Sequence, residues 1–314
     1  MRPRRGVALI AALWLVVAIA AVALQFSMEA HERRAVGILA SERGIQRAAA
    51  LGALALTQAK LEYALRVAPT GTNVQRLAAS DPWLDVDSLY SGPVDVDSMQ
   101  VDVRARDLGE KLNVNLLTEN QLQTFFSFVL GDYAKSTQLA QSILDWRDAD
   151  SIPRPNGAER DGYIKAKMLA LPTNGPFREI DELSNVMGMT PDIYAKVAPY
   201  LTTHGAGAVN INTAPIAVLR ALPGMTDATI NMIVQQRSQG RRINSIGDIL
   251  STGRNLAGML SAVQLQTAIG SRVVYQTTEV ELTITSRVGP QAPPSRLTAI
   301  LRRGNPVNVT FKEW

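Results

Sequence analysis

Residues 1–24, MRPRRGVALIAALWLVVAIAAVAL, decide the topology of this chain. A basic hexapeptide ends in Gly6, and eighteen residues from Val7 to Leu24 follow without a single charge. Eighteen helical residues span about 27 Å, which is close to the ~30 Å thickness of a bilayer core. Because basic residues stay on the cytoplasmic side, the three leading arginines predict that everything after Leu24 lies across the inner membrane.

Three kinds of N-terminal segment share this pattern: a secretory signal peptide, a plain membrane anchor and a type IV prepilin leader. Ala21 and Ala23 match a signal-peptidase site, although the apolar run is longer than the ~7–15 residues typical of such peptides. A prepilin leader is a basic hexapeptide that ends in glycine directly before the apolar helix, so that cleavage falls between Gly6 and Val7. The helical pattern continues far beyond the membrane, which favours the prepilin leader.

The helix is predicted to extend over residues 7–66, a rod of about 90 Å, because no proline occurs before Pro69. Three glycines between residues 37 and 52 each cost about 1 kcal/mol relative to alanine, so bending or fraying is expected. Apolar residues with helical spacing form a stripe along the part of this helix beyond the membrane. This stripe consists of Ile38, Ile45, Ala49 and Leu56.

Alternating apolar and polar residues predict strands on both sides of a long helical stretch. The first strand covers residues 99–106, and the later ones contain alternating apolar residues near 280–284, 297–301 and 307–311. Between them, residues from Asn115 to about Ala268 have a helical pattern with short Gly/Pro turns. The fold class predicted is therefore α+β, with a long N-terminal helix packed on one antiparallel sheet and a large all-α block inserted into it.

These patterns divide the chain into consecutive segments. The expected organisation is a leader (1–6), a transmembrane part of the first helix (7–24), its periplasmic part (25–66), a first part of the sheet domain (67–111), an inserted all-α domain (112–270) and C-terminal strands (271–314).

The inserted segment contains an internal repeat with a spacing of 36 residues. Residues 186–197 recur as residues 222–233, and each copy has a helix end, a glycine hairpin and a threonine N-cap. Such helix-hairpin-helix units often bind DNA phosphates through backbone N–H groups. Here Thr190 and Thr226 replace the second glycine of the DNA-binding form, which hinders close approach of a phosphate. The hairpins therefore favour structural packing, and a membrane-tethered DNA receptor for DNA uptake is the alternative function.

A second segment carries metal-binding chemistry. Five carboxylates fall within the 17 residues from 145 to 161, around a loop bent by proline and glycine. Calcium prefers six to eight oxygen ligands held by an irregular loop. Asp148 and Asp150 can point together from a turn, and Glu159 and Asp161 can return after the bend. The residues alone leave two interpretations open: a calcium site, or a solvated acidic loop paired with the neighbouring arginines.

The composition argues against an enzyme. Cysteine is absent and only two histidines occur, which excludes disulfide scaffolds, cysteine nucleophiles and multi-histidine metal catalysis. The sequence contains neither a phosphate-binding P-loop nor a nucleophile elbow. A net charge of only +4 also makes a global nucleic-acid-binding polyelectrolyte a poor interpretation.

Three stretches together resemble the minor pseudopilin K family of type II secretion systems. The first is RGVALI at residues 5–10, which opens the apolar helix. The second is DWRDAD at 145–150 followed by PNGAE at 155–159, and the third is NINTA at 210–214 followed by LPGMT at 222–226. Each motif is only moderately specific, but their order along nearly the whole chain matches the family.

The resemblance implies a non-enzymatic protein that caps the tip of the pseudopilus. Such a protein is needed for assembly of the fibre and for export of folded proteins across the outer membrane. Its implied partners are minor pseudopilins I and J, the prepilin peptidase and the bacterial inner membrane, with nucleic acid not among them. It would cross that membrane once, with a cytoplasmic N-terminus and a periplasmic head.

The family also implies specific sites. A prepilin peptidase would cleave between Gly6 and Val7 and methylate the new N-terminus at Val7. Structural calcium is expected, with Asp148, Asp150, Glu159 and Asp161 as ligand candidates.

The fifth mature position departs from the general pilin pattern. Most pilins have glutamate there, which is thought to pair with the N-terminal amine of a neighbouring subunit, whereas this chain has Ala11. An unpaired charge in lipid is costly, so a subunit without the acceptor suits the end of a fibre.

Overall fold

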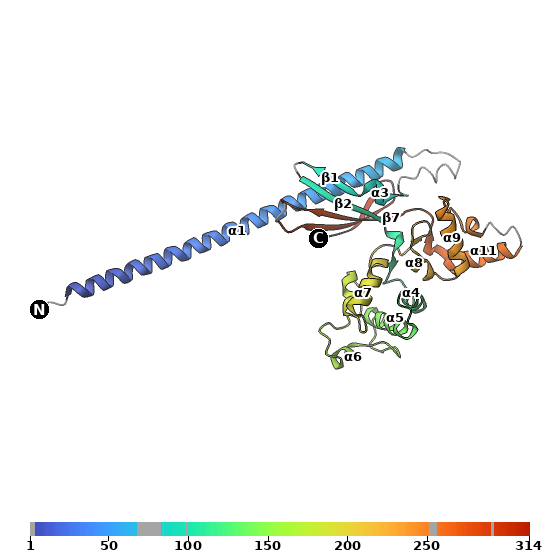
Figure 1. Ribbon diagram of the computed structural model, residues 1–314, viewed down its shortest axis with the longest axis horizontal. Helices are drawn as coiled ribbons and strands as arrows, with labels where there is room; N and C mark the ends of the chain where they lie inside the picture. The colour runs from blue at the N-terminus through green and yellow to red at the C-terminus, as the bar shows by residue number, and fades with distance from the viewer. Residues whose placement is uncertain (1–3, 68–82, 84, 98, 251–255, 290–291) are drawn as a thin grey trace.

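The first helix is continuous and dominates the shape of the molecule. The computed structural model describes residues 4–67, 83, 85–97, 99–250, 256–289 and 292–314. Helix α1 (Arg4–Val67) has 64 residues, which corresponds to about 96 Å. Its N-terminal part projects away from the rest of the protein, while its C-terminal part lies along the sheet (Figure 1). The predicted long helix is confirmed, and the three glycines do not interrupt it.

A five-stranded antiparallel sheet packs against α1. The strands are β1 (Gly92–Val96), β2 (Met99–Asp107), β7 (Glu279–Ser286), β8 (Ser295–Arg302) and β9 (Asn308–Glu313), in the order β1-β2-β7-β8-β9. A short helix, α3 (Val86–Tyr90), precedes β1. Because β2 pairs directly with β7, residues 108–278 lie between two neighbouring strands of one sheet. The mixed fold class predicted from the sequence is confirmed.

The face of α1 that is buried against the sheet is not the apolar stripe. Of the four stripe residues only Ala49 is buried, while Ile38 and Ile45 are 59% and 48% exposed. The helix instead contacts the sheet through smaller side chains, because alanine lets its backbone approach the strands closely. Gly52 continues this contact, since a Cβ there would lie 2.7 Å from Cγ1 of Val96 on β1. The buried residues of α1 are Gln46, Ala49, Ala50, Ala53, Leu54, Thr57 and Leu61.

The last strand also departs from the predicted alternation. A β-bulge between Ile300 and Leu301 shifts the register, so that Phe311 pairs with Ile300 while Val309 pairs with Leu301. Val309 and Phe311 therefore lie on opposite faces of the sheet, although they are two residues apart. Phe311 faces away from α1 and contacts His204 with a ring-centroid distance of 3.9 Å.

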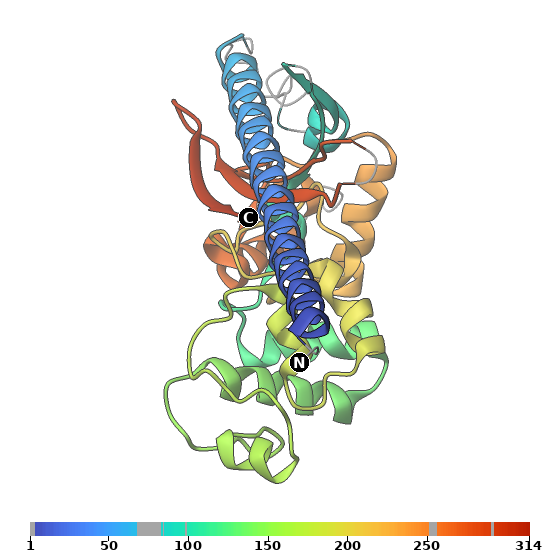
Figure 2. The ribbon, with the colours of Figure 1, turned by 90° about the vertical axis from the view of Figure 1, so that its left-hand side faces the viewer.

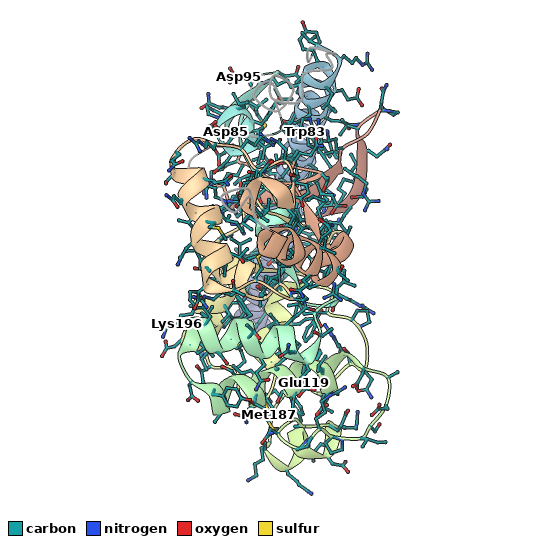
Figure 3. The ribbon with its side chains drawn as sticks, turned by 90° about the vertical axis from the view of Figure 1, so that its right-hand side faces the viewer. Trp83, Asp85, Asp95, Glu119, Met187 and Lys196 are labelled. Atoms are coloured by element: carbon teal, nitrogen blue, oxygen red, sulfur yellow. The ribbon has the colours of Figure 1, made fainter. Side chains whose placement is uncertain are left out.

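Residues 108–278 form a predominantly helical block with its own core, separate from the core between α1 and the sheet. Figure 3 shows the two parts, with Trp83 and Asp95 near one end of the molecule and Glu119 and Met187 near the other. The elements of the block in chain order are η1 (Leu108–Glu110), β3 (Leu112–Asn113), α4 (Glu119–Leu130), α5 (Tyr133–Arg147), α6 (Arg160–Lys165), η2 (Ile180–Asn185), α7 (Pro191–Val197), η3 (Ala198–Tyr200), β4 (Leu201–Thr202), β5 (Val209–Asn210), α8 (Ile216–Arg220), α9 (Asp227–Ser238), α10 (Ile246–Leu250), α11 (Leu256–Ile269), η4 (Gly270–Arg272) and β6 (Val273–Val274).

The block is built from two equivalent units. In the first unit β3 pairs in parallel with β4, and in the second β5 pairs in parallel with β6. The Asn113 and Asn210 Oδ1 atoms each accept a hydrogen bond from the backbone N–H two residues further on, at 3.0 Å. The local structure therefore repeats with a spacing of 97 residues, and the 36-residue echo relates one hairpin of the first unit to a hairpin of the second.

A second pair of asparagines extends the equivalence. Asn115 bonds the backbone N–H and C=O of Phe177 through its side chain, and Asn212 bonds the same groups of Ile243. Each asparagine thereby joins the start of its unit to the chain that returns after the first helical hairpin.

An arginine occupies corresponding places in the two units. Arg147 donates to the carbonyl oxygens of Val114 and Leu117, and Arg237 donates to those of Ile211 and Ala214. After its arginine, the first unit has a long loop that reaches Phe177, whereas the second unit reaches Ile243 within six residues. The acidic segment is therefore an addition to the first unit.

Asp107, at the end of β2, joins the sheet to the second unit. Its side chain is 3% exposed and accepts four hydrogen bonds from protein groups. The donors are the Gly109 backbone N–H, Asn210 Nδ2, Thr213 Oγ1 and Thr277 Oγ1, at 2.6–2.9 Å. A buried carboxylate with this many donors holds the connected segments in one arrangement. Figure 2 shows the resulting geometry, with α1 in front of the sheet and the helical block extending below it.

Candidate functional site

The N-terminal part of α1 is the first functional element. Among the described residues, α1 from residue 12 onward is long and apolar enough to cross a membrane, by length and composition. None of the apolar window found among the described residues is buried, and Leu13, Trp14 and Leu24 are each more than 60% exposed. In water this surface would be unfavourable, so a non-aqueous environment or other subunits must cover it.

The second element is the acidic loop between α5 and α6. Asp148, Asp150 and Glu159 each offer a carboxylate oxygen, and these atoms lie within 4.8 Å of one another. Asp148 is the C-cap of α5 and Glu159 is the N-cap of α6, so two helix ends bring the carboxylates together. Three of the four predicted ligand candidates therefore meet in space.

The fourth candidate, Asp161, is not part of this group. It lies in the first turn of α6, where its side chain is exposed. Residues at N-cap and N2 positions point in different directions, which the sequence pattern did not capture.

Several oxygens in the acidic group have no hydrogen-bond donor. Both carboxylate oxygens of Glu159 and Oδ1 of Asp148 are buried and lack a partner among the described residues. Glu159 is only 5% exposed. Burial, followed by the charges of Asp145, Asp148 and Asp150, raises the pKa of the Glu159 carboxyl group. A buried carboxylate with acidic neighbours is unfavourable unless it binds a cation or a proton.

One arginine partly neutralises the loop. Arg154 Nη1 lies 2.6 Å from both Asp145 Oδ1 and Asp148 Oδ2. Asp145, whose importance the sequence did not reveal, is fully buried and also accepts the Arg154 backbone N–H at 3.1 Å. In the described part of the chain, Arg154 forms no ion pair with Asp148 Oδ1, Asp150 or Glu159.

The loop is held by specific contacts with α5. A Cβ at Gly157 would lie 2.0 Å from Asp145 Oδ2, so only glycine fits against this carboxylate. The Asn156 backbone N–H donates to Gln141 Oε1 at 2.7 Å, which fixes the returning chain. The acidic group is thus supported by the helix rather than by a freely solvated loop.

The donor chemistry fits calcium. All candidate ligand atoms are oxygens, the class that calcium prefers, and the group contains buried oxygens that need a positive charge. Asp148, Asp150 and Glu159 would hold the ion, and loop carbonyl groups or water would complete its coordination.

The hairpins do not present a clear phosphate site. Thr190 and Thr226 cap α7 and α9 by accepting backbone N–H groups, as predicted, and Asp192 and Asp227 occupy the first turns. The Arg237 guanidinium group, near the end of α9, donates its hydrogen bonds to backbone carbonyls, and burial lowers its pKa to about 10. Acidic first turns oppose phosphate binding, so these contacts favour the packing role.

Comparison with protein families identifies the helical block. Residues 97–206 match a family model described as Type II secretion system (T2SS), protein K, and residues 209–270 match a second one with the same description. Together the two matches cover more than half of the chain, and their boundary falls between the two structural units.

Individual relatives agree with the family match. The chain is 34% identical over 123 residues to the type II secretion system protein K of Pectobacterium carotovorum, covering 36% of this chain and 38% of that protein. It is 25% identical over 257 residues to the putative type II secretion system protein K of Escherichia coli K12, covering 74% and 75%. The chain thus aligns with little more than a third of the first relative and with three quarters of the second.

The structural comparison concerns the whole fold. One solved structure, the GspK-GspI-GspJ complex from enterotoxigenic Escherichia coli, contains a chain that matches with a TM-score of 0.63 and 19% identity. The match covers 87% of this chain and 97% of that one.

A long apolar N-terminal helix whose distal half packs on an antiparallel sheet defines the chain as a pilin-like protein. The two helical units match family models that belong to one group of pilin-like proteins. The chain belongs to the type II secretion system protein K family, the minor pseudopilin family that the resemblance indicated. This family is a structural component of the secretion system and is not a known enzyme family.

Proposed function

We propose that this chain caps the tip of the type II secretion pseudopilus and supports export of folded proteins across the outer membrane. The observation that carries the proposal is α1, which has an exposed apolar N-terminal part and a distal part packed on the sheet. Such a helix can remain in the membrane while its head lies outside. The basic residues before the apolar run favour a cytoplasmic N-terminus and a periplasmic head.

The size of the head supports a terminal position. The helical block extends to one side of the sheet (Figures 1 and 2), so heads of this kind would collide if they were stacked closely along a shaft. Ala11 supports the same position, because it provides no carboxylate for the N-terminal amine of a neighbouring subunit.

Minor pseudopilins I and J are the partners that we propose. The solved chain of the same fold comes from a GspK-GspI-GspJ complex. In the present chain, α1 exposes large apolar side chains between the apolar N-terminal run and the sheet, which suits packing with other helices. These residues are Val36, Ile38, Leu39 and Ile45.

The partner assignment is tested with the full chain in detergent and purified I and J of the same system. Replacing Ile38 and Ile45 with serine is expected to weaken the complex at least tenfold, because apolar contact with partner helices is lost. Ile216→Ser is a matched control, since Ile216 is 42% exposed on α8 in the head. If the unaltered chain bound neither protein at high concentration, the proposed function would be wrong.

Processing is the next part of the proposal. A prepilin peptidase removes residues 1–6 and methylates Val7. We expect Gly6→Ala to leave the precursor uncleaved, because a side chain at this position hinders the peptidase. Mass spectrometry of the intact protein distinguishes cleavage after Gly6 with one added methyl group from cleavage after Ala23. Normal mature mass in the Gly6→Ala variant would contradict the leader assignment.

We also propose that calcium stabilises the acidic loop, with Asp148, Asp150 and Glu159 as ligands. The support is the group of buried carboxylate oxygens without a donor among the described residues, which are both oxygens of Glu159 and Oδ1 of Asp148. The role is structural, because the ion would join the end of α5 to the start of α6.

A further inference from the structure

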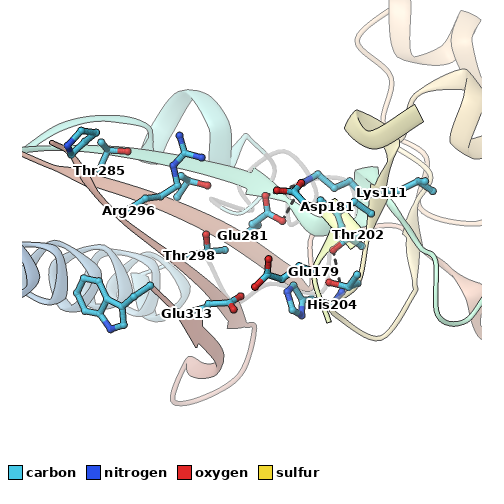
Figure 4. Close-up of a pocket in the computed structure, with 16 residues that line it drawn as sticks. Lys111, Glu179, Asp181, Thr202, His204, Glu281, Thr285, Arg296, Thr298 and Glu313 are labelled. Atoms are coloured by element: carbon cyan, nitrogen blue, oxygen red, sulfur yellow. Dashed lines mark hydrogen bonds and ion pairs between the residues drawn. The ribbon is translucent and has the colours of Figure 1, made fainter. Parts of the chain in front are cut away.

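A groove lies between the sheet and the helical block, on the face of the sheet opposite α1. Its volume is about 610 Å³, and Figure 4 shows the side chains around it. The sheet contributes alternate residues of β7 and β8, whose neighbours in sequence point to the α1 core. The helical block contributes residues 179–181 and 201–204. Because α1 covers the other face, this face of the sheet is left without a packed layer over the groove.

The charges that line the groove do not balance. Four acidic side chains face two basic ones, and His204 stays neutral because burial lowers its pKa. Lys111 is already paired with Glu281, at 2.9 Å between Nζ and Oε1. The remaining acidic residues are Glu179, Asp181 and Glu313.

Glu179 and Glu313 point toward each other across the groove (Figure 4). One precedes η2 in the helical block and the other ends β9 in the sheet. The negative charge of Glu313, followed by a hydrogen bond between the two carboxyl groups, raises the pKa of Glu179, because two ionised carboxylates at this position repel each other. Within the described ranges, neither of them forms an ion pair with a basic residue. Tyr194 donates to Asp181, which leaves the Glu179–Glu313 pair as the acidic position that no basic residue neutralises among the residues described.

A single positive charge lies further along the same groove. Arg296 precedes Thr298 by two residues on β8, and Thr298 is the cross-strand partner of Glu313. Two residues of a strand cover about 6.6–6.8 Å. Arg296 is exposed and, in the part of the chain that the structure describes, makes no ion pair. The groove therefore has an acidic position and a basic position that are offset by two residues along the strand direction and lie on neighbouring strands.

We propose that this groove binds an extended segment of a partner protein, which places a lysine or arginine between Glu179 and Glu313 and an acidic side chain beside Arg296. In an extended chain, residues i and i+2 point to the same side about 6.6–6.8 Å apart, which matches the offset of the two positions along the strand direction, and the long basic and acidic side chains cover the lateral offset. The threonines at 283, 285 and 298 supply hydroxyl groups for the polar backbone of such a segment. Trp314, 44% exposed at the groove, offers an apolar surface for a side-chain stem.

The charges of the groove define which side chains the partner segment should carry. A basic side chain relieves the repulsion between the two carboxylates, and an acidic side chain two residues away avoids repulsion by Arg296. This groove is separate from the apolar surface of α1, so the inference does not depend on the proposed packing of helices.

The experiment uses the full chain in detergent at about 10 mM salt, where charges are weakly screened. The probe is the peptide acetyl-Thr-Lys-Thr-Glu-Thr-amide, and the control peptide has glutamine in place of lysine and glutamate. Binding is followed by calorimetry and by the fluorescence of Trp314, assigned with a Trp314→Phe variant. The charged peptide is expected to bind at least tenfold more tightly than the neutral one.

Two variants locate the effect. The double substitution Glu179→Gln, Glu313→Gln is expected to remove the tenfold preference, while Asp192→Asn, an exposed acid on α7 outside the groove, retains it. Equal binding of the two peptides, an unchanged preference in the double variant, or binding of calcium alone at this pair would each overturn the proposal. Failure of the chain to bind I and J would overturn the proposed function and leave the peptide result standing.

Discussion

The substitution Glu159→Gln tests the acidic loop in depth, because its effect on stability should change sign with calcium. Without metal, Glu159 is a buried carboxylate with no hydrogen-bond donor and with acidic neighbours. Glutamine has a similar shape and no charge, so the variant should be more stable than the unaltered chain in excess chelator. A buried polar group without partners costs about 1–3 kcal/mol and a charged one costs more, so the gain should be at least of this order.

With calcium bound, the unaltered chain should be more stable than the Glu159→Gln variant, because it gains the free energy of calcium binding. Calcium-binding extracellular modules have Kd values of about 10⁻⁴–10⁻³ M. At about 10 mM calcium such a site stabilises the native state by about 1.4–2.7 kcal/mol. For a folded body of 150–250 residues this corresponds to an increase in melting temperature of about 3–11 °C. The Glu159→Gln variant lacks one ligand and should gain little.

The assay is thermal unfolding of the full chain in detergent, followed by near-ultraviolet circular dichroism in calcium and in chelator. Trp146, stacked on Phe177 with a centroid distance of 6.0 Å, reports on the packing next to the loop. Asp161→Asn is the matched control, because Asp161 is exposed and lies outside the acidic group, and it should keep the full calcium effect.

Two results would refute this reasoning. If the melting temperature of the unaltered chain were the same in calcium and in chelator, the loop would hold no stabilising ion. If Glu159→Gln were destabilising in chelator, Glu159 would have a donor in the metal-free state and the carboxylates would not be unsatisfied.

Two further predictions concern the contact of α1 with the sheet, and Glu110 in η1 where the helical block begins. Gly52→Ala should destabilise the fold by about 1–3 kcal/mol in chemical denaturation, because the new methyl group overlaps with Val96. Gly44→Ala is the control and should be neutral or stabilising, because Gly44 has open space around it. Restored stability when Gly52→Ala is combined with Val96→Ala would support the overlap, and equal effects of Gly52→Ala and Gly44→Ala would contradict it. Burial and then the charge of Asp107 raise the pKa of Glu110 to about 7. The folded state therefore holds this proton above pH 4.5, and the associated stability is lost as the pH rises through 7. Glu110→Gln should make stability less dependent on pH by on the order of 1–3 kcal/mol between pH 5 and 8, and parallel pH profiles for the two proteins would contradict the assignment.

Much of the architecture could be predicted because it depends on local patterns. Charge-free residues and the absence of proline predict a long helix, and period-two alternation predicts β2, β7 and β8. Threonine before a helix and glycine at a positive φ predict the hairpins at Gly188 and Gly224. The domain boundaries and the sites of cleavage and methylation stay predictions.

Other features depended on contacts that no local pattern encodes. The sequence did not show which face of α1 meets the sheet; the alanine face allows closer packing, and it leaves Ile38 and Ile45 of the apolar stripe exposed. The bulge at Ile300 reversed the face of Phe311. The 97-residue repeat became visible only through equivalent hydrogen bonds in the two units. The acidic loop lengthens the first unit, so residues after the loop no longer have the 97-residue spacing to their counterparts in the second unit.

The order of residues was sufficient to identify an apolar helical rod, an α+β head and a cluster of acids in a bent loop, since each arises from neighbours in the chain. Three-dimensional packing was needed to separate Asp161 from the other three acids, to bury Asp145 against Arg154, and to bring Glu179 and Glu313 together from distant segments. Such groupings follow from long-range contacts, and the free energy of a charge depends on which groups surround it after folding.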